Sequence, residues 1–259
     1  MRKILFKDVQ LNHANTSWED FDRQKNKLFN FPFLNKKEWL DMPVLNNEII
    51  GIAEIEKFRV VQQETRDSCG TCAAKMVIET LLSQYKINKH IDEKDVIHHS
   101  FLPKLGLIKK TIGITQDQLA SWIQKLLDEN NIDYTTAVQH FMSYPQIKRY
   151  LKHWAYMIFS YMWDTIDNPH KSKDGEKDML LKGVHHPHYC VLLKIDEDKK
   201  IVTIANPFGY QEELPFNEFW QRISLDPKYL HSNKLYIPLV ESGIYKPRSC
   251  VIVSKKNIQ

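Results

Sequence analysis

The chain has 259 residues and carries 36 Lys plus Arg against 32 Asp plus Glu, a formal net charge of +4. Hydrophobic residues make up 42% and charged residues 26% of it, values that exclude a collagen-like, coiled-coil or wholly disordered chain. Its basic residues are scattered rather than gathered in one arginine-rich stripe, so we expect no nucleic-acid partner. No apolar stretch approaches the roughly 20 residues of a membrane helix, so we expect no membrane partner either.

The cysteine count and the N-terminal residues bear on the compartment. Four cysteines are too few for a disulfide scaffold in a chain of this length, which favours a reducing compartment. The N-terminal residues end their short apolar run before a secretory signal could form. We therefore expect a cytoplasmic protein, or one exported without a cleavable signal peptide, as bacterial effectors are. The cysteines are Cys69, Cys72, Cys190 and Cys250.

Two regions differ in their patterns. Residues 1–57 mix aromatic residues with Asn and Lys and indicate an extension packed on the main domain, which we place at residues 58–259. The main domain begins with a strand candidate at 58–62, followed by a polar turn at 65–68. Residues 69–85 then form a helix so rich in apolar residues that we expect it to be central.

Helices dominate the next part of the domain, and strands follow them. Thr115 and Gln118 form a capping box that begins an amphipathic helix ending near Asn130, and Ser143 begins another helix. A polar loop follows at 164–183, and a loop of this length is often functional. The expected strands are 132–138, 155–162, 188–195, 201–206, 235–240 and 250–254, with a short helix at 215–223. This order predicts an α+β fold rather than a doubly wound sheet.

Cys69 is the first candidate for chemistry, because it lies where a polar turn meets the apolar helix. The first N–H groups of a helix lack partners within it, and their partial positive charge favours a thiolate, the nucleophilic form of cysteine. Ser68 or Asp67 can cap this helix, and Gly70 permits close approach of another chain or of a substrate backbone.

A reactive thiol needs a proton acceptor, and the hairpin of strands 188–195 and 201–206 offers one. His188 opens the first strand and Asn206 closes the second, so they should pair within a residue or two across the ladder. The amide can then fix the tautomer of the imidazole. Gln63, six positions before Cys69, could donate to an oxyanion beside the Cys69 N–H. These residues could therefore act as nucleophile, base, orienter and oxyanion donor.

Three stretches resemble a known family. In the first, Gln63 is followed by five residues and then by Cys69-Gly70 at the start of an apolar helix. The second is the strand His188-Tyr-Cys-Val-Leu-Leu, and the third is the turn Asn206-Pro-Phe-Gly. All three are similar to motifs of the papain-like cysteine peptidases. Within these, they resemble the double-glycine leader peptidases and their stand-alone relatives. The resemblance covers about residues 58–223. The chain departs from it at Ser68, where these peptidases usually have Asp.

The resemblance implies a papain-like α+β fold in which a nucleophile helix packs on an antiparallel sheet. It implies a cysteine peptidase that cleaves a peptide or isopeptide bond of a peptide or protein substrate through a thioester, with Cys69, His188 and Asn206 as triad and Gln63 as oxyanion donor. We expect no cofactor. The same fold also serves acyltransferases, transglutaminases and peptide-binding modules that have lost turnover.

Several other interpretations of the same residues stay open. Cys72 is a rival nucleophile, although the Gln63 spacing favours Cys69. The Cys69-Gly-Thr-Cys72 stretch could be a thioredoxin-like redox pair, or could bind zinc together with His185, His186 or His188. Cys69 could also be a packed core thiol and His188 an ordinary strand residue. Trp163 could line a substrate groove, although core packing is the commoner role of such a residue.

Overall fold

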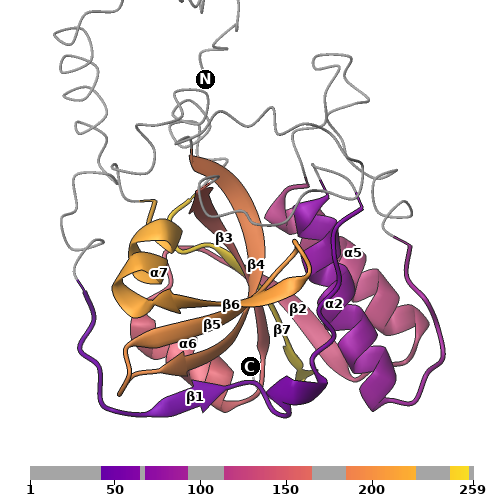
Figure 1. Ribbon diagram of the computed structural model, residues 1–259. Helices are drawn as coiled ribbons and strands as arrows, with labels where there is room; N and C mark the ends of the chain where they lie inside the picture. The colour runs from indigo at the N-terminus through magenta and orange to yellow at the C-terminus, as the bar shows by residue number, and fades with distance from the viewer. Residues whose placement is uncertain (1–41, 65–67, 93–113, 165–184, 226–245, 257–259) are drawn as a thin grey trace, which may run out of the picture. The chain divides into compact units, whose positions relative to one another are not determined.

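Figure 1 shows the computed structural model, which describes residues 42–64, 68–92, 114–164, 185–225 and 246–256, with backbone alone for residues 164 and 185–187. All structural statements below concern these residues. Four expected segments lie largely or wholly outside them: residues 1–41 of the extension, most of the polar turn at 65–68, the loop at 164–183 except its first residue, and the strand at 235–240.

The architecture is α+β, with helices packed on one antiparallel sheet. The sheet has seven strands in the order β2-β7-β3-β4-β5-β6, and β1 pairs with the far end of β4. The strands are β1 (Ile49–Gly51), β2 (Tyr134–Gln139), β3 (Tyr156–Asp164), β4 (His185–Asp196), β5 (Ile201–Asn206), β6 (Tyr210–Pro215) and β7 (Cys250–Lys255). The helices are η3 (Ile55–Lys57), α2 (Cys69–Gln84), α5 (Gln116–Glu129), α6 (Tyr144–Lys152) and α7 (Phe216–Ile223).

Helix α2 is the central helix that the sequence predicts. Every residue from Gly70 to Leu82 is buried, including Thr71, Lys75 and Glu79, which recur every four residues on one side of the helix. In Figure 1 it lies beside α5, while α6 and α7 are on the other side of the strands. Tyr156 of β3 contacts Gln84 of α2 through its hydroxyl, whereas Phe159 of the same strand packs against α7. The two helices therefore cover opposite faces of β3.

Local capping signals define two helix starts. The Thr115 hydroxyl accepts from the Gln118 N–H at 3.3 Å, and the Gln118 side chain accepts from the Thr115 N–H at 3.1 Å, which confirms the predicted capping box. Ser143 precedes α6, and its N–H donates to the Gln146 side chain at 2.8 Å. The helix expected at 215–223 is confirmed as α7.

Three elements differ from the expectation. Residues 58–62 form no strand, because their only ladder contact is a single bridge between Gln62 and Phe208. Strand β6 was not expected, since two consecutive Glu residues interrupt its alternation. Strand β1 lies within the segment assigned to the extension, and its backbone pairs Ile49 with Asp196 and Ile50 with Ile195 of β4. Residues 49–51 are therefore part of the sheet of the main domain.

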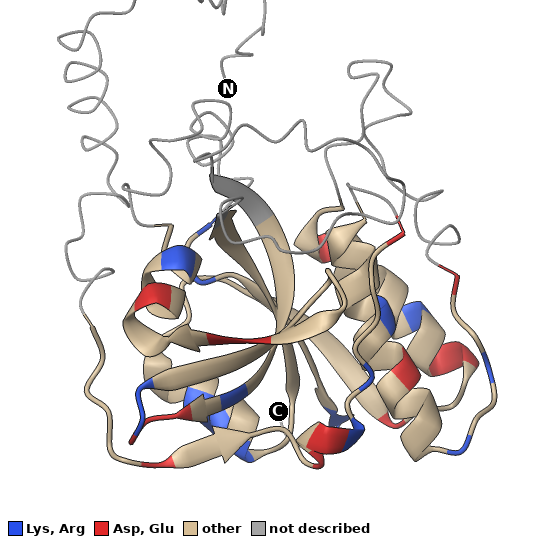
Figure 2. Cartoon of the chain, in the orientation of Figure 1, with Lys and Arg blue, Asp and Glu red and all other residues tan. Residues whose placement is uncertain are grey.

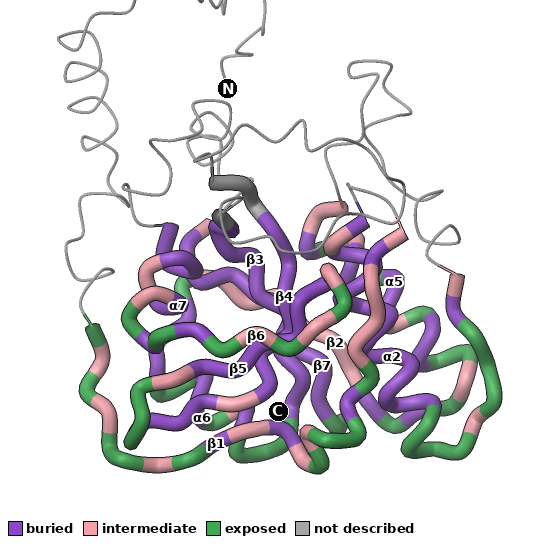
Figure 3. Tube along the Cα trace, in the orientation of Figure 1, coloured by how far each residue is buried: buried purple, intermediate pink, exposed green. Residues whose placement is uncertain are grey.

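The centre of the sheet is buried, and charges lie around it. Figure 3 shows the middle strands as almost wholly buried, and Figure 2 shows charged residues of both signs on the helices and at strand ends. The strand β6 is an exception, because it carries its acidic segment across the middle of the strand (Figure 2). Glu212 of that segment contacts Asn206, one of the candidate site residues.

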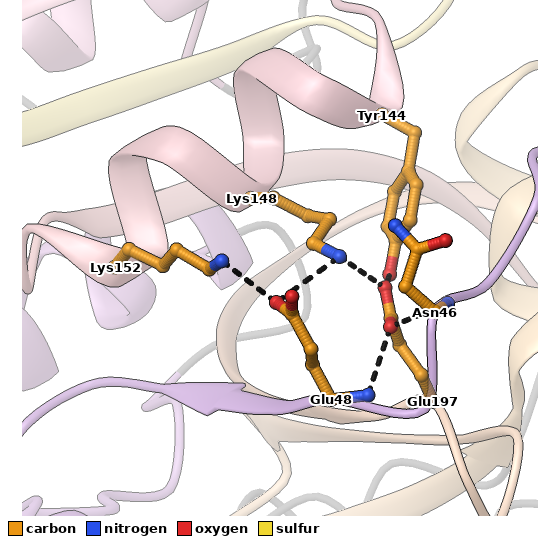
Figure 4. A network of polar contacts seen from close by, with 6 residues as sticks. All are labelled: Asn46, Glu48, Tyr144, Lys148, Lys152 and Glu197. Carbon is orange, nitrogen blue, oxygen red and sulfur yellow. Dashed lines mark hydrogen bonds and ion pairs between the residues drawn. The ribbon is translucent and has the colours of Figure 1, made fainter.

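A polar cluster ties β1 and α6 to the turn that joins β4 and β5 (Figure 4). Its centre is the fully buried carboxylate of Glu197, which accepts from Lys148 Nζ at 2.7 Å and from the Tyr144 hydroxyl at 2.5 Å. The same carboxylate accepts from the N–H groups of Asn46 at 2.8 Å and Glu48 at 3.0 Å. We call this set the Glu197 cluster; it comprises Asn46, Glu48, Tyr144, Lys148, Lys152 and Glu197.

Candidate active site

The hairpin of β4 and β5 brings His188 and Asn206 together. The register of these two strands pairs Val191 with Ala205, which places Asn206 opposite Cys190, two positions from His188 and on the same face. His188 Nε2 lies 3.1 Å from Asn206 Oδ1, and both residues are buried. The two side chains therefore meet as the strand lengths suggest.

The amide of Asn206 is fixed in one orientation. Its Oδ1 accepts from the N–H of Phe208 at 3.1 Å, and a backbone N–H can only donate. Its Nδ2 donates to the carboxylate of Glu212 at 2.7 Å and to the hydroxyl of Tyr161 at 3.3 Å. Rotating the amide by half a turn would place donor against donor and acceptor against acceptor, so this orientation is the stable one.

This orientation decides which nitrogen of His188 carries a proton. Because Asn206 Oδ1 can only accept, His188 Nε2 must donate to it. In the neutral ring the other nitrogen, Nδ1, then holds the lone pair and is the basic position. The arrangement therefore produces an imidazole that can take a proton at a defined atom.

Aromatic rings surround the imidazole. Phe208 stacks on it with 4.9 Å between ring centroids and 14° between the planes. Trp163 and Tyr161 of β3 each lie at 5.7 Å, and Trp163 also contacts Phe208 at 4.7 Å. These rings limit the access of water to the imidazole, so the hydrogen bond to Asn206 lies in a low-dielectric environment that strengthens it. Trp163 is buried among these rings and so packs against the site itself.

The start of α2, with Cys69 as its first residue, packs against the same strand. A Cβ on Gly70 would lie 3.0 Å from the ring of Tyr189 and 2.6 Å from Ile114 Cγ2, so a larger residue would have to displace these side chains. The hydroxyl of Tyr189 donates to the carbonyl of Ile114 at 3.0 Å, which holds the ring there. Within this chain, Ile114 and Tyr189, the latter next to His188, therefore make the close approach permitted by Gly70.

The segment before α2 reaches the turn after Asn206. The N–H of Gln63 donates to the carbonyl of Pro207 at 2.6 Å, and the Gln63 side chain is buried. Cys72 is fully buried, with its Sγ 3.4 Å from the carbonyl oxygen of Val61 and 3.9 Å from that of Pro207. The α2 start, the Gln63 segment and the Asn206 turn are therefore packed together.

The four thiols differ in accessibility. Cys69 is partly exposed, whereas Cys72, Cys190 and Cys250 are buried. Burial raises the pKa of the Cys190 thiol well above its ordinary value, and it raises the pKa of Cys250 as well. A reagent in solution can therefore reach Cys69 more readily than the other three, which favours Cys69 over Cys72 as a nucleophile.

Sequence reasoning missed three side chains that contact the pair. Tyr161 could have been found by alignment of β3 with β4, where it lies directly opposite His188. Phe208 is two residues after Asn206, in a turn that was singled out for other reasons. Glu212 had no signal, because strand β6 was not expected. Among the described residues, no three His, Cys, Asp or Glu side chains group as metal ligands would.

Comparisons with known proteins add one structural likeness. No protein-family model matches the sequence, and no curated protein matches it. A crystal structure described as that of a C39-like peptidase from Bacillus anthracis superposes with a TM-score of 0.48 and 11% sequence identity, over 81% of this chain and 98% of the other. Within the described residues, no helix combines the length and the apolar character needed to cross a membrane.

Proposed function

We propose that this chain is a cysteine peptidase with a papain-like arrangement, which cleaves a peptide or isopeptide bond of a peptide or protein substrate. Cys69 is the nucleophile, His188 the base, Asn206 the residue that orients His188, and Gln63 the oxyanion donor together with the Cys69 N–H. The reaction needs no cofactor in this proposal. The protein acts in the cytoplasm, or outside the cell after export.

One observation carries the proposal. The hydrogen bond between His188 Nε2 and Asn206 Oδ1, with the amide held from its other side, assigns the basic lone pair to Nδ1. The strand that carries this imidazole packs through its next residue, Tyr189, against the residue after Cys69. A partly exposed thiol at a helix start and an imidazole with a defined basic atom are the two parts that thiol acylation needs.

The proposed reaction passes through a thioester between Cys69 and the acyl part of the substrate. His188 Nδ1 takes the proton of the Cys69 thiol, and the thiolate forms a bond to the carbonyl carbon of the substrate. The carbonyl oxygen becomes an oxyanion, which Gln63 and the Cys69 N–H stabilise. The carbon–nitrogen bond then breaks as His188 Nδ1 returns its proton to the leaving amine. Water, deprotonated by His188, attacks the thioester and releases the acid and the free thiol.

Alkylation of Cys69 as a function of pH tests the proposal. Exposure alone would make Cys69 react before the buried thiols, so the diagnostic quantity is the pH profile of its rate with iodoacetamide. We expect wild type to react nearly as fast at pH 6 as at pH 8, and His188→Ala to show a rate that rises about tenfold per pH unit there, as for an ordinary thiol. His153→Ala, which removes an exposed histidine at the end of α6, is the matched control.

A wild-type profile identical to that of His188→Ala would refute the proposal and would favour a non-catalytic peptide-binding module. If the thiol is activated, a peptide library with and without amine acceptors separates a peptidase from an acyltransferase or transglutaminase. Hydrolysis products alone indicate a peptidase, and products joined to the amine indicate a transferase. Cys69→Ala should abolish either activity.

A further inference from the structure

We infer that Glu212 is a positioning residue, whose carboxylate sets the orientation of the Asn206 amide and thereby the protonated nitrogen of His188. This inference rests on the proposed function of His188 and Asn206. It adds a fifth residue to Cys69, His188, Asn206 and Gln63, one that acts through its hydrogen bond to Asn206.

The contact is made across the pair of strands β5 and β6. Asn206 lies opposite Tyr210 in the register, and Glu212 is its diagonal neighbour on the same face. Glu212 Oε2 accepts from Asn206 Nδ2 at 2.7 Å, a charge-assisted hydrogen bond of the stronger kind. Glu212 is partly buried and Asn206 is fully buried, so little water competes for this contact.

The carboxylate is the contact that most strongly distinguishes the two ends of the amide. The hydroxyl of Tyr161, the other partner of Nδ2, can act as donor or acceptor and would tolerate either end. An ionised carboxylate only accepts, so it repels Oδ1 and holds Nδ2. Together with the Phe208 N–H at the opposite end, it fixes which atom of Asn206 faces His188.

The charge of Glu212 also bears on why an amide stands at position 206. A carboxylate at that position would face the Glu212 carboxylate at hydrogen-bond distance in a buried site, where two such groups cannot both ionise without cost. Burial, together with the charge of Glu212, raises the pKa of Tyr161 well above its ordinary value, so its phenol stays neutral. Arg222 of α7 is ion-paired with Glu218, and its positive charge partly opposes the rise in the pKa of Tyr161.

The first test reads the imidazole directly and does not require turnover. In a Cys69→Ala background, ring nitrogen chemical shifts should show His188 protonated at Nε2. Glu212→Leu should yield a mixture of tautomers, whereas Glu212→Gln, which keeps an acceptor, should retain the Nε2-protonated ring. Glu213→Leu, an exposed neighbour on the same strand, is the control and should change nothing.

The second test uses the thiol of the chain with Cys69 intact. Glu212→Leu should lower the alkylation rate of Cys69 near pH 7 by roughly tenfold or more, because part of the His188 population holds its proton at the wrong nitrogen. Glu212→Gln should stay within about threefold of wild type. A structural role alone would lower the stability of Glu212→Leu without changing the tautomer or the pH profile.

Exchanging the amide at position 206 and the carboxylate at position 212 tests the inference even if Glu212→Leu fails to fold. Asn206→Asp should be destabilised at neutral pH and regain stability as the pH falls, because one of two facing carboxylates must take up a proton. Asn206→Asp combined with Glu212→Gln should lose this pH dependence and recover the wild-type alkylation profile.

The outcomes separate this inference from the proposed function. An ordinary pH profile of wild-type Cys69 refutes the proposed function, while the tautomer measurement still tests Glu212. An activated wild-type thiol combined with an unchanged tautomer in Glu212→Leu overturns the inference alone. An exchange variant no better than Asn206→Asp also overturns it, since the two groups would then be independent.

Discussion

Replacing Glu197 with Gln should change how the stability of the protein depends on pH. Burial opposes ionisation of this carboxyl, but hydrogen bonds from Lys148 and Tyr144, and from the N–H groups of Glu48 and Asn46, outweigh it. Together they lower the pKa of Glu197 from 4.5 to about 2. The folded state therefore holds the ionised form far more tightly than the unfolded chain does.

The size of the effect follows from the two pKa values. A difference between 4.5 and about 2 corresponds to about 3 kcal/mol of unfolding free energy. Because the pKa is lowered on folding, this contribution is fully present above about pH 5 and is lost as the pH falls towards 2. Glu197→Gln lacks the titrating group, so its stability should fall less over the same range.

Urea unfolding followed by tryptophan fluorescence at several pH values between about 2.5 and 7 measures this difference. The stability advantage of wild type over Glu197→Gln should shrink by about 3 kcal/mol from neutral to acid pH. Asp198→Asn, which removes an exposed carboxylate from the same turn, is the control and should follow wild type. Parallel curves for wild type and Glu197→Gln would refute the reasoning, because the cluster would then exert no preference for the ionised form.

Three further substitutions test other parts of the structure. Gly70→Ala introduces a Cβ 3.0 Å from the Tyr189 ring, so it should cost about 1–3 kcal/mol of unfolding free energy and slow the alkylation of Cys69. Unchanged stability and an unchanged alkylation rate would mean that this contact is loose. Phe208→Ala removes the ring stacked on His188 and should make the alkylation profile of Cys69 more like that of an ordinary thiol, which the same assay detects. Thr115→Ala removes a helix cap and should lower the unfolding free energy by about 1 kcal/mol in urea, with no effect on alkylation.

The features that the sequence predicts well are those specified by neighbours along the chain. The capping box of Thr115 and Gln118 needs only residues three apart, and the apolar run of α2 needs no partner to be recognised. The His188–Asn206 contact is longer in range, but it lies within one hairpin, where counting from the turn is enough. Each of these depends on a single local piece of geometry.

The features that were missed depend on pairing that the sequence does not display. Strand β6 carries Glu212 and Glu213 side by side, which breaks the alternation expected of a half-buried strand, yet its backbone pairs fully with β5. Residues 58–62 show the opposite error, a strand that was expected but does not form. Their composition suits a strand, yet their ladder pairing consists of a single bridge at Gln62. The contact between Glu212 and Asn206 could be inferred only after the β5–β6 register was known.

The β4–β5 hairpin carries two carboxylate contacts at opposite ends, and this separation makes the two tests independent. Glu197 follows the last residue of β4, while His188 lies eight residues back along the strand from Asp196, roughly 26 Å at 3.3 Å per residue. A change in the charge of Glu197 is screened over such a distance, so Glu197→Gln should lower stability without moving the alkylation profile of Cys69. Glu212 is in hydrogen-bond contact with the amide that faces His188, so its substitution should move that profile. If Glu197→Gln shifted the profile as strongly as Glu212→Leu, the orientation of His188 would depend on the rigidity of the whole hairpin rather than on the hydrogen bonds of Asn206.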